Sequence, residues 1–415
     1  MTSIQNSRIT TDVVIVGGGV AGASCAAALV AAGLDVVVIE REAIFRDRVR
    51  GEGIHPWGVL EVEKLGLLDL LRSAGAHDLP RWTTYRNREV SDAFAWDDDR
   101  PGWPGELTMY HPRLQATLLD HVVTAGARVL RPGRVTEFQP GERPRLTVAL
   151  PDSVVEVSAR LVVGADGRAS ATRAWIGAAA MSDPTHHAIG GCLLDGIGVD
   201  ETSTHMAMFD GGFVLLFPEG ERKARAYVIC QTELAEQLRG RANIPAFIQQ
   251  CAAALPEGAL SDARASGPLA FFPNANSWAD RIVGDKIVLI GDAAGANDPS
   301  LGQGLSLCFR DARELRDALS GAADWQSAIE EFAQRRSDYF ATLCEHARWM
   351  MRLTTETGPK ADARRALVGR ARQIDPDAGG FGSIIALGPD GLVADEAARR
   401  RFFGEGLADV PDAVA

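Results

Sequence analysis

The chain has few features that would bind a nucleic acid or a membrane. Only four of its 43 basic residues are lysines, and its formal net charge at pH 7 is −12. Nothing supplies the basic face that binding to phosphate backbones requires, so a nucleic-acid partner is not expected. No apolar run reaches the ~18 residues of a membrane span, and the polar start from Met1 to Thr11 lacks the apolar core of a signal peptide. We therefore expect a cytoplasmic protein with no membrane contact.

Cysteine pairs and metal-ligand spacings are missing as well. The six cysteines form no Cys-x-x-Cys pair and lie mostly among apolar residues, which favours reduced thiols with a structural role. His186 and His187 are adjacent in sequence, and His346 stands alone on an expected helix, so these histidines lack the spacing of metal ligands. We assign them surface or capping roles and predict no metal site.

The first informative feature is a strand followed by a glycine turn and a helix. An apolar run at residues 13–16 predicts a buried strand. Gly17, Gly19 and Gly22 then form Gly-x-Gly-x-x-Gly before an alanine-rich stretch. The first glycine suits the tight turn, the second lets the backbone approach a pyrophosphate, and the third lets the helix pack closely on the strand. The free N–H groups and the dipole of the helix would bind phosphate charge, so the pattern predicts a dinucleotide site.

Glu40 supports this interpretation. It follows the next apolar run, 36–39, and stands 18 positions after Gly22 (40 − 22 = 18), where a carboxylate that binds a ribose belongs. Glycine turns alone are more often only structural, but the flanking strands and the acid together favour a bound dinucleotide. NAD and FAD both fit this first unit.

Two later apolar strands end in further motifs. One runs into Asp166-Gly167-Arg168, and the other into Gly291-Asp292, which is followed by Pro299 and the stretch 302–305. Taken together and in this order, the motifs resemble those of the class A (single-component) FAD-dependent monooxygenases of the para-hydroxybenzoate hydroxylase fold. The resemblance covers roughly the first four fifths of the chain, and several motifs at once are more specific than any one. Two positions depart from the family pattern, with Gly295 in place of a histidine and Ser306 in place of an asparagine.

The resemblance implies non-covalent FAD and assigns residues to it. Glu40 would hold the adenosine ribose, Asp292 would bind hydroxyls near the pyrophosphate, and the loop from Pro299 would lie against the isoalloxazine ring. Arg50 and Arg113 would flank the cofactor. The implied cofactor-binding residues are Gly17, Gly19, Val20, Ala21, Gly22, Glu40, Arg41, Arg50, Arg113, Asp166, Gly167, Gly291, Asp292, Pro299, Gly302, Gln303, Gly304 and Leu305.

The expected fold is α/β, with a Rossmann-type FAD-binding domain interleaved with an antiparallel-sheet substrate domain, and with helices at the C-terminus. Short strands at close spacing over residues 186–231 indicate the antiparallel sheet. Apolar residues at helical spacing after Asp311 indicate the helices. The expected FAD-binding domain comprises 1–80, 104–182 and 273–325, the substrate domain 81–103 and 183–272, and the C-terminal helical region 326–415.

The chemistry that the resemblance implies uses NADPH or NADH as a transient co-substrate, because the chain has one full dinucleotide fingerprint and not two. O₂ would form a flavin C4a-hydroperoxide that hydroxylates or epoxidises a small, aromatic substrate. The candidate catalytic residues are His55 and Pro299; His55 could act as a general base, donate to the flavin, or only cap the helix that starts at Pro56. The candidate pocket aromatics, some of them expected in the core, are Trp82, Tyr85, Trp96, Trp103, Phe209, Phe213, Phe217 and Phe272. A monomer or homodimer is expected.

Other functions stay open at this point. A reductase of the geranylgeranyl-reductase type also carries a Gly-Glu near Glu52, and a lack of O₂ consumption would favour it. A flavin-dependent halogenase is disfavoured because the Trp-x-Trp-x-Ile-Pro motif is absent. In addition, none of the four lysines lies at the distance expected for the lysine that carries an activated chlorine. A flavoprotein without enzymatic activity is disfavoured by the long substrate-type sheet and the Pro-x-x-Gly-Gln-Gly loop.

Overall fold

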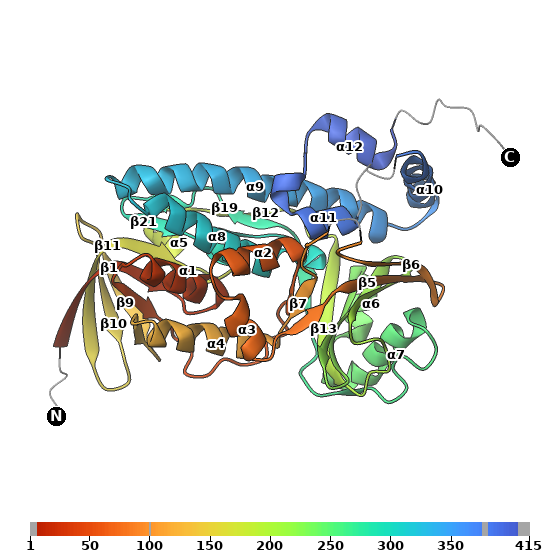
Figure 1. Cartoon of the computed structure of the whole chain (residues 1–415), viewed down its shortest axis with the longest axis horizontal. Coiled ribbons are helices and arrows are strands. Elements are labelled where there is room, and N and C mark those ends of the chain that lie inside the picture. The colour runs from red at the N-terminus through yellow and green to blue at the C-terminus, as the bar shows by residue number, and fades with distance from the viewer. Residues whose placement is uncertain (1–5, 99–100, 376–380, 406–415) are drawn as a thin grey trace.

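The computed structural model describes residues 6–98, 101–375 and 381–405. Its fold is α/β, as expected, and its two large sheets are assembled from interleaved segments of the chain (Figure 1). Helices of the C-terminal part lie across both (Figure 1). The division into the three expected sets of domain boundaries stays a prediction.

The first sheet has a parallel centre. Its order is β20 (Val283–Gly284), β21 (Ile287–Leu289), β11 (Val154–Gly164), β1 (Asn6–Val16), β2 (Val36–Ile39) and β8 (Arg128–Leu130), with β9 (Arg134–Gln139) and β10 (Arg145–Ala149) extending β11. β1 pairs in parallel with both β2 and β11, and β11 pairs in parallel with β21. The glycine-terminated strands of the sequence motifs are therefore neighbours, and their carboxyl ends meet at one edge.

Helices cover the first sheet on the side of Val13 and Ile15, which are fully buried. Val14 points to the opposite face, because side chains alternate along a strand. The covering helices are α1 (Val20–Ala31), α4 (His111–Thr124) and α8 (Gly304–Leu319), with α9 (Trp325–Thr354) packed on α8 (Figure 1). This packing fixes the starts of α1 and α8 beside the edge where the strands end.

The second sheet is mainly antiparallel. Its order is β17 (Arg264–Ala265), β13 (His187–Asp195), β16 (Lys223–Cys230), β15 (Gly212–Gly220), β14 (Ser203–Phe209), β5 (Arg81–Arg86) and β6 (Glu89–Ala95), and β18 (Ala270–Asn274) also pairs with β13. One pair, β5 with β14, is parallel because β5 enters the sheet from a distant segment. α6 (Thr232–Leu238) and α7 (Ile244–Ala254) cover one face of this sheet, which leaves the other face for the site.

The remaining elements are short or lie outside the two sheets. They are β3 (Gly53–Ile54), α2 (Pro56–Lys64), α3 (Leu68–Ser73), β4 (His77–Leu79), β7 (Glu106–Thr108), α5 (Thr172–Trp175), β12 (Ala180–Ser182), η1 (Arg241–Asn243), β19 (Ser277–Ala279), η2 (Gly291–Ala293), β22 (Gly295–Ala296), η3 (Pro299–Leu301), α10 (Pro359–Ile374), α11 (Phe381–Leu387), η4 (Pro389–Gly391) and α12 (Glu396–Phe403).

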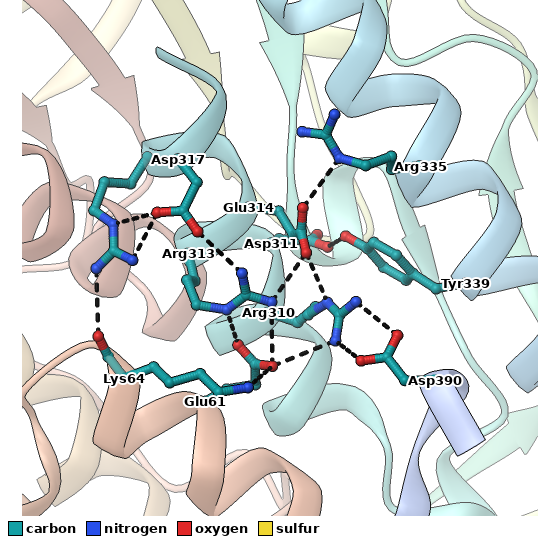
Figure 2. Close-up of polar contacts among 11 residues, drawn as sticks. Glu61, Lys64, Arg310, Asp311, Arg313, Glu314, Asp317, Arg335, Tyr339 and Asp390 are labelled. Atoms are coloured by element: carbon teal, nitrogen blue, oxygen red, sulfur yellow. Dashed lines mark hydrogen bonds and ion pairs between the residues drawn. The ribbon is translucent and has the colours of Figure 1, made fainter. Parts of the chain in front are cut away.

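Ion pairs attach the C-terminal part to the first sheet's helices (Figure 2). Arg310 on α8 lies 2.5 Å from Asp390 of η4 and 3.3 Å from Glu61 of α2. Arg313, one turn along α8, also pairs with Glu61. Glu61 is 2 % exposed, so its charge is compensated by two guanidinium groups inside the protein. The network holds α2, α8 and the C-terminal part together.

Candidate active site

Two cavities meet at the carboxyl ends of β1 and β11. The inner cavity has a volume of about 290 Å³ and includes His55 and residues of the 299–305 loop. The distal cavity has a volume of about 320 Å³ and includes Glu40. Both are lined by Gly19, Arg50, His111, Gln115, Ala165 and Gly167. Because they share these residues, the two cavities form one elongated site across the end of the sheet.

Different physical constraints explain the three glycines that follow β1. Gly17 has φ +108°, and a Cβ there would lie 2.4 Å from the Ala165 carbonyl oxygen. A Cβ at Gly22 would lie 1.9 Å from the Gly17 carbonyl oxygen, so both positions exclude side chains on folding grounds alone. At Gly19 the nearest atom to a Cβ would be Nε2 of Gln115, at 3.6 Å. The space beside Gly19 is therefore open to a ligand.

The start of α1 points its amide groups into this space. Val20 and Ala21 line the inner cavity, and the N-cap, Gly19, makes no side-chain capping hydrogen bond. The first N–H groups of a helix have no partner within the helix, and the helix dipole favours an anion beside them. The uncapped turn is thus a suitable phosphate site.

Glu40 forms a fixed acceptor in the distal cavity. The residue is 6 % exposed, and its carboxylate accepts hydrogen bonds from the N–H groups of Gly18 and Glu42, each at 2.7 Å. Arg41 also lines this cavity, and its Nε lies 3.5 Å from the Glu42 carboxylate. The carboxylate of Glu40 keeps lone pairs for hydroxyl donors, because each of its oxygens can accept more than one hydrogen bond.

Arg50 stands where the two cavities join. Burial lowers the pKa of its guanidinium, the charge of Asp292 opposes that shift, and the charge of Arg168 adds to it. Asp292 lines the inner cavity 3.5 Å from Nε of Arg168. Val49 has φ +54°, which is strained for a β-branched residue, and it directs the chain into Arg50. The junction thus holds two arginines and one acid.

The Asp166-Gly167 and Gly291-Asp292 motifs are stabilised in different ways. Asp166 lines the distal cavity, but its carboxylate accepts from Ser170 Oγ at 2.6 Å and Thr172 Oγ1 at 2.7 Å, so it shapes the turn after β11. Gly291 has φ +55° and donates its N–H to Asp311 at 2.7 Å. It does not line either cavity. Gly291 therefore positions the next residue, Asp292.

The loop from residue 299 to 305 closes the inner cavity. Pro299, Gly302, Gly304 and Leu305 line it, whereas Gln303 is fully buried and donates to the Leu301 carbonyl oxygen at 2.8 Å. Gly302 has φ +66° and ends the short η3 helix. A Cβ at Gly304 would meet no protein atom within 4 Å. The loop presents backbone and open space to the cavity, and Gln303 fixes its shape.

Both ring nitrogens of His55 bind protein groups. Nε2 lies 2.8 Å from the Leu301 carbonyl oxygen, and Nδ1 lies 2.5 Å from Oε1 of Glu106. A carbonyl oxygen only accepts, so Nε2 carries the proton. Thr204 donates to the other oxygen of Glu106, which is fully buried. His55 lies at the inner cavity, as expected, but neither ring nitrogen is left for a substrate proton.

The second sheet supplies an apolar wall opposite the 299–305 loop. Of the eight candidate aromatics, Trp82, Phe217 and Phe272 line the inner cavity. Tyr227, which was not among the candidates, lines it too, and its hydroxyl donates to the Arg50 carbonyl oxygen at 2.7 Å. A flat ring between this wall and the loop would be shielded from water on both sides.

A buried charge cluster lies beside this wall, because Arg225 pairs in register with Phe217 and shares its face of the sheet, and Glu52 lines the inner cavity. The fully buried Arg225 donates from Nε and Nη2 to Glu52 at 2.7 and 2.8 Å, and from Nη2 to Asp47 at 2.8 Å. Although burial acts to raise it, these hydrogen bonds hold the pKa of Glu52 below its ordinary value. Burial and the Glu52 carboxylate raise the pKa of Glu219 to about 10. Glu219 is therefore neutral at pH 7 and can donate to Glu52.

The adjacent histidines do more than cap the chain. His187 is fully buried; its Nε2 lies 2.8 Å from Oγ of Ser300 and 3.3 Å from Asp298, and its Nδ1 lies 2.7 Å from His186. His186, His187 and Asp298 each offer a ligand atom within 4.8 Å of the others. The sequence could not indicate this group because Asp298 is far from the pair along the chain. Its hydrogen bonds hold η3 in place.

Arg113 is an expected residue whose side chain lies away from the site. It is exposed on α4, with its guanidinium 2.9 Å from where a Cβ on Gly75 would be. His111 and Gln115, one helical turn apart, line both cavities in its place. Residues four apart share one helix face, and a residue two positions from each faces away. We therefore leave Arg113 out of the proposed site.

Comparison with known proteins identifies the family. The model of a family described as FAD binding domain matches residues 10–344, most of the chain. The chain belongs to this family. The expected FAD cofactor, the fold and the FAD-dependent monooxygenase class are confirmed for this flavoprotein. In the described ranges, no helix is both long and apolar enough to cross a membrane.

Three relatives illustrate the flavoprotein's similarities. It is 26 % identical to rifampicin monooxygenase of Streptomyces venezuelae over 85 % of its own length and 74 % of the relative's. It is 28 % identical to digeranylgeranylglycerophospholipid reductase 1 of Methanopyrus kandleri, over 83 % and 91 % of the two chains. The crystal structure of p-nitrophenol 4-monooxygenase PnpA from Pseudomonas putida superposes with a TM-score of 0.76 at 20 % identity, covering 91 % and 96 % of the chains.

Proposed function

We propose that this flavoprotein oxidises NADPH or NADH and inserts one oxygen atom from O₂ into an aromatic substrate held in the inner cavity. The observation that carries the proposal is that one cavity contains both the backbone loop 299–305 and the apolar wall of the second sheet. Bound FAD would supply the hydride acceptor and the reaction with O₂. A cytoplasmic location is part of the same proposal.

The elongated site fits FAD along its whole length. At the distal end, Glu40 would accept hydrogen bonds from ribose hydroxyls. In the middle, the uncapped start of α1 would bind the pyrophosphate, with Arg50 and Asp292 on the other side. At the inner end, the open space at Gly304 would take the ring system.

The chain's own residues would orient the substrate and exclude water. The start of α8 at Gly304 has no side-chain cap, so its N–H groups and dipole favour negative charge in the inner cavity. Trp82, Phe217 and Phe272 would pack against a substrate ring and remove water from around it. His55 would act as a positioning residue, because its Nε2–H holds the Leu301 carbonyl group and with it the shape of the loop.

A reductase is the second candidate function. The 28 % identity to a digeranylgeranylglycerophospholipid reductase over most of both chains supports it, as does the Gly-Glu pair that ends at Glu52. In that case the enzyme would transfer reducing equivalents to an apolar double bond and would not need O₂.

The deciding experiment measures oxygen incorporation. Purified yellow holoenzyme would be screened with aromatic compounds for those that accelerate NADPH or NADH oxidation, under air enriched in ¹⁸O₂. We expect O₂ consumption to match coenzyme oxidation and the product to contain one ¹⁸O atom. Coenzyme oxidation that proceeds equally well without O₂, with a product reduced at a double bond, would establish the reductase instead.

A further inference from the structure

A third cavity, which we call the outer chamber, lies next to the inner cavity. Its volume is about 1030 Å³, and Trp82 lines both spaces. The indole of Trp82 donates to Oγ1 of Thr84, which lines only the outer chamber. Trp82 therefore forms a shared wall, held by a contact on the outer side.

The two spaces lie on the same face of the second sheet. Met206 of β14 pairs in register with Thr84 of β5 and with Leu215 of β15. Cross-strand partners point to the same face, so these three side chains form one row. Leu215 lines the inner cavity, whereas Met206 and Thr84 line the outer chamber. The substrate wall thus continues from one space into the other.

The C-terminal helices enclose the outer chamber from the opposite side. Met350 of α9, Gly369 of α10 and Ala386 of α11 line it, and Figure 1 shows these helices gathered beside β5 and β6. Met206 and Met208 face them from the sheet. Methionine is flexible and polarisable, so such walls adapt to apolar rings of differing shape.

The lining of the outer chamber is basic, although the whole chain is acidic. Its described lining residues include Arg86, Arg365 and Arg372 but only one acid, Asp92. Arg365 also pairs with Asp362 of the same helix, which compensates part of its charge. Burial and, after it, the neighbouring charge of Arg86 lower the pKa of Arg372, so two like charges lie close together in one partly desolvated space. An anion in this space would be attracted by the positive charge of Arg86 on the sheet side of the chamber.

We propose that the outer chamber binds the remote part of an extended substrate, an apolar ring system that ends in an anionic group such as a carboxylate. Its reacting part would lie in the inner cavity, past Trp82. This inference rests on the proposed function, because it names the substrate class for the same site. The inner cavity has a volume of about 290 Å³ and would have to hold both the flavin ring and the reacting ring of the substrate. The other rings of a multi-ring substrate would then lie in the outer chamber.

Gly369 allows a direct test. It lies between Arg365 and Arg372 at helical spacing on the chamber face of α10, and a Cβ there would meet no atom within 4 Å. Gly369→Phe would place a ring inside the chamber, beside Arg365 and Arg372, without a backbone clash. Gly369→Ala is the matched control, since both changes favour the helix over glycine. Circular dichroism and FAD content would establish that both variants fold.

The binding arm uses two fluorescent probes on FAD-loaded enzyme. Anilinonaphthalene sulfonate carries rings and an anion, and phenylnaphthylamine carries the same rings without charge. We expect Gly369→Phe to weaken both by about tenfold or more and Gly369→Ala to change them by less than about twofold. Arg86→Gln should weaken only the sulfonate, by about two- to fivefold.

The outcomes separate the chamber from the reaction. Equal probe affinity in Gly369→Phe and Gly369→Ala, or no binding to the unmodified holoenzyme, would overturn the inference even if the enzyme is a monooxygenase. If the probes bind as expected but the enzyme incorporates no ¹⁸O, the outer chamber is supported as a binding site and the proposed oxygen insertion is rejected. For multi-ring compounds that accelerate coenzyme oxidation, Gly369→Phe should raise KM and retain kcat. For single-ring compounds both constants should be unchanged. Equal effects on the two kinds of compound would reject the proposal of an extended substrate.

Discussion

Replacing Glu219 with glutamine should make the stability of the protein less dependent on pH. Glu219 is neutral in the folded protein, because burial and the Glu52 carboxylate raise its pKa from 4.5 to about 10. Glutamine keeps the neutral charge and an N–H donor for Glu52 but cannot lose a proton. The substitution therefore isolates the effect of this one titration.

The sign and size follow from the two pKa values. Between pH 4.5 and about 10 the folded protein holds a proton on Glu219 that the unfolded chain has released. Unfolding then releases a proton. The contribution of neutral Glu219 to the free energy of unfolding is therefore complete below pH 4.5 and is lost as the pH rises toward 10. One proton corresponds to at most ~1.4 kcal/mol per pH unit. Because the proton is shared with Glu52, we expect Glu219→Gln to gain about 1–2 kcal/mol over wild type between pH 6 and 8.

Thermal unfolding of the holoenzyme across this pH range measures the effect. The gain should appear as a difference in Tm of about 1–4 °C that grows with pH. Glu236→Gln is the matched control, since Glu236 forms only an exposed ion pair with Arg239 and its change should alter Tm little at any pH. A constant or shrinking difference between Glu219→Gln and wild type would refute the assignment of a neutral Glu219.

Three further predictions test the cofactor site. Glu40→Ala should weaken FAD binding by ~1.5–3 kcal/mol, or about 10- to 100-fold, because a charged acceptor and the anchor of Gly18 are both lost; an unchanged dissociation constant in an FAD titration would remove Glu40 from the ribose site. Gly304→Val should still bind FAD but be reduced slowly and at a lower potential, because the new side chain meets only the space assigned to the ring; wild-type potential in spectroelectrochemistry would place the loop elsewhere. His55→Gln should shift the flavin absorption spectrum and lower kcat without removing a limb of the pH–rate profile, and loss of a limb would instead identify His55 as a base.

The phosphate-binding half of the site could be predicted from the sequence because its parts are local. Gly17, Gly19 and Gly22 lie within one turn, and the conflicts that a Cβ would meet at two of them arise from the turn itself and from the adjacent strand. Glu40 follows at a distance set by one helix and one strand. Such spacing is fixed by the geometry of a strand–helix–strand unit, so a single sequence contains it.

Errors arose where a side chain's direction mattered. The segment that contains Arg113 lies beside the cavities, since His111 and Gln115 of the same helix line them. Only the side of the helix on which Arg113 lies differs from the expectation. The spacing of the apolar residues on α4 could have indicated that side, because Leu114 and Leu118 mark the buried face. The resemblance supplied the segment but not its orientation.

The substrate half of the site depends on pairs that no local pattern contains. Arg225 binds Glu52 across 173 residues, and His55 binds Leu301 across 246. Each pair joins an early segment to a late one, because Glu52 and His55 precede the second sheet in the chain, whereas Arg225 lies on β16 and Leu301 in η3. A histidine or glutamate in a loop is compatible with catalysis, capping or a buried pair until its partner is known. For His55 the partner decides the role: with Nε2–H bound to a carbonyl oxygen and Nδ1 bound to Glu106, the residue can stiffen the loop at the reacting end of the site but has no free lone pair with which to act as a base.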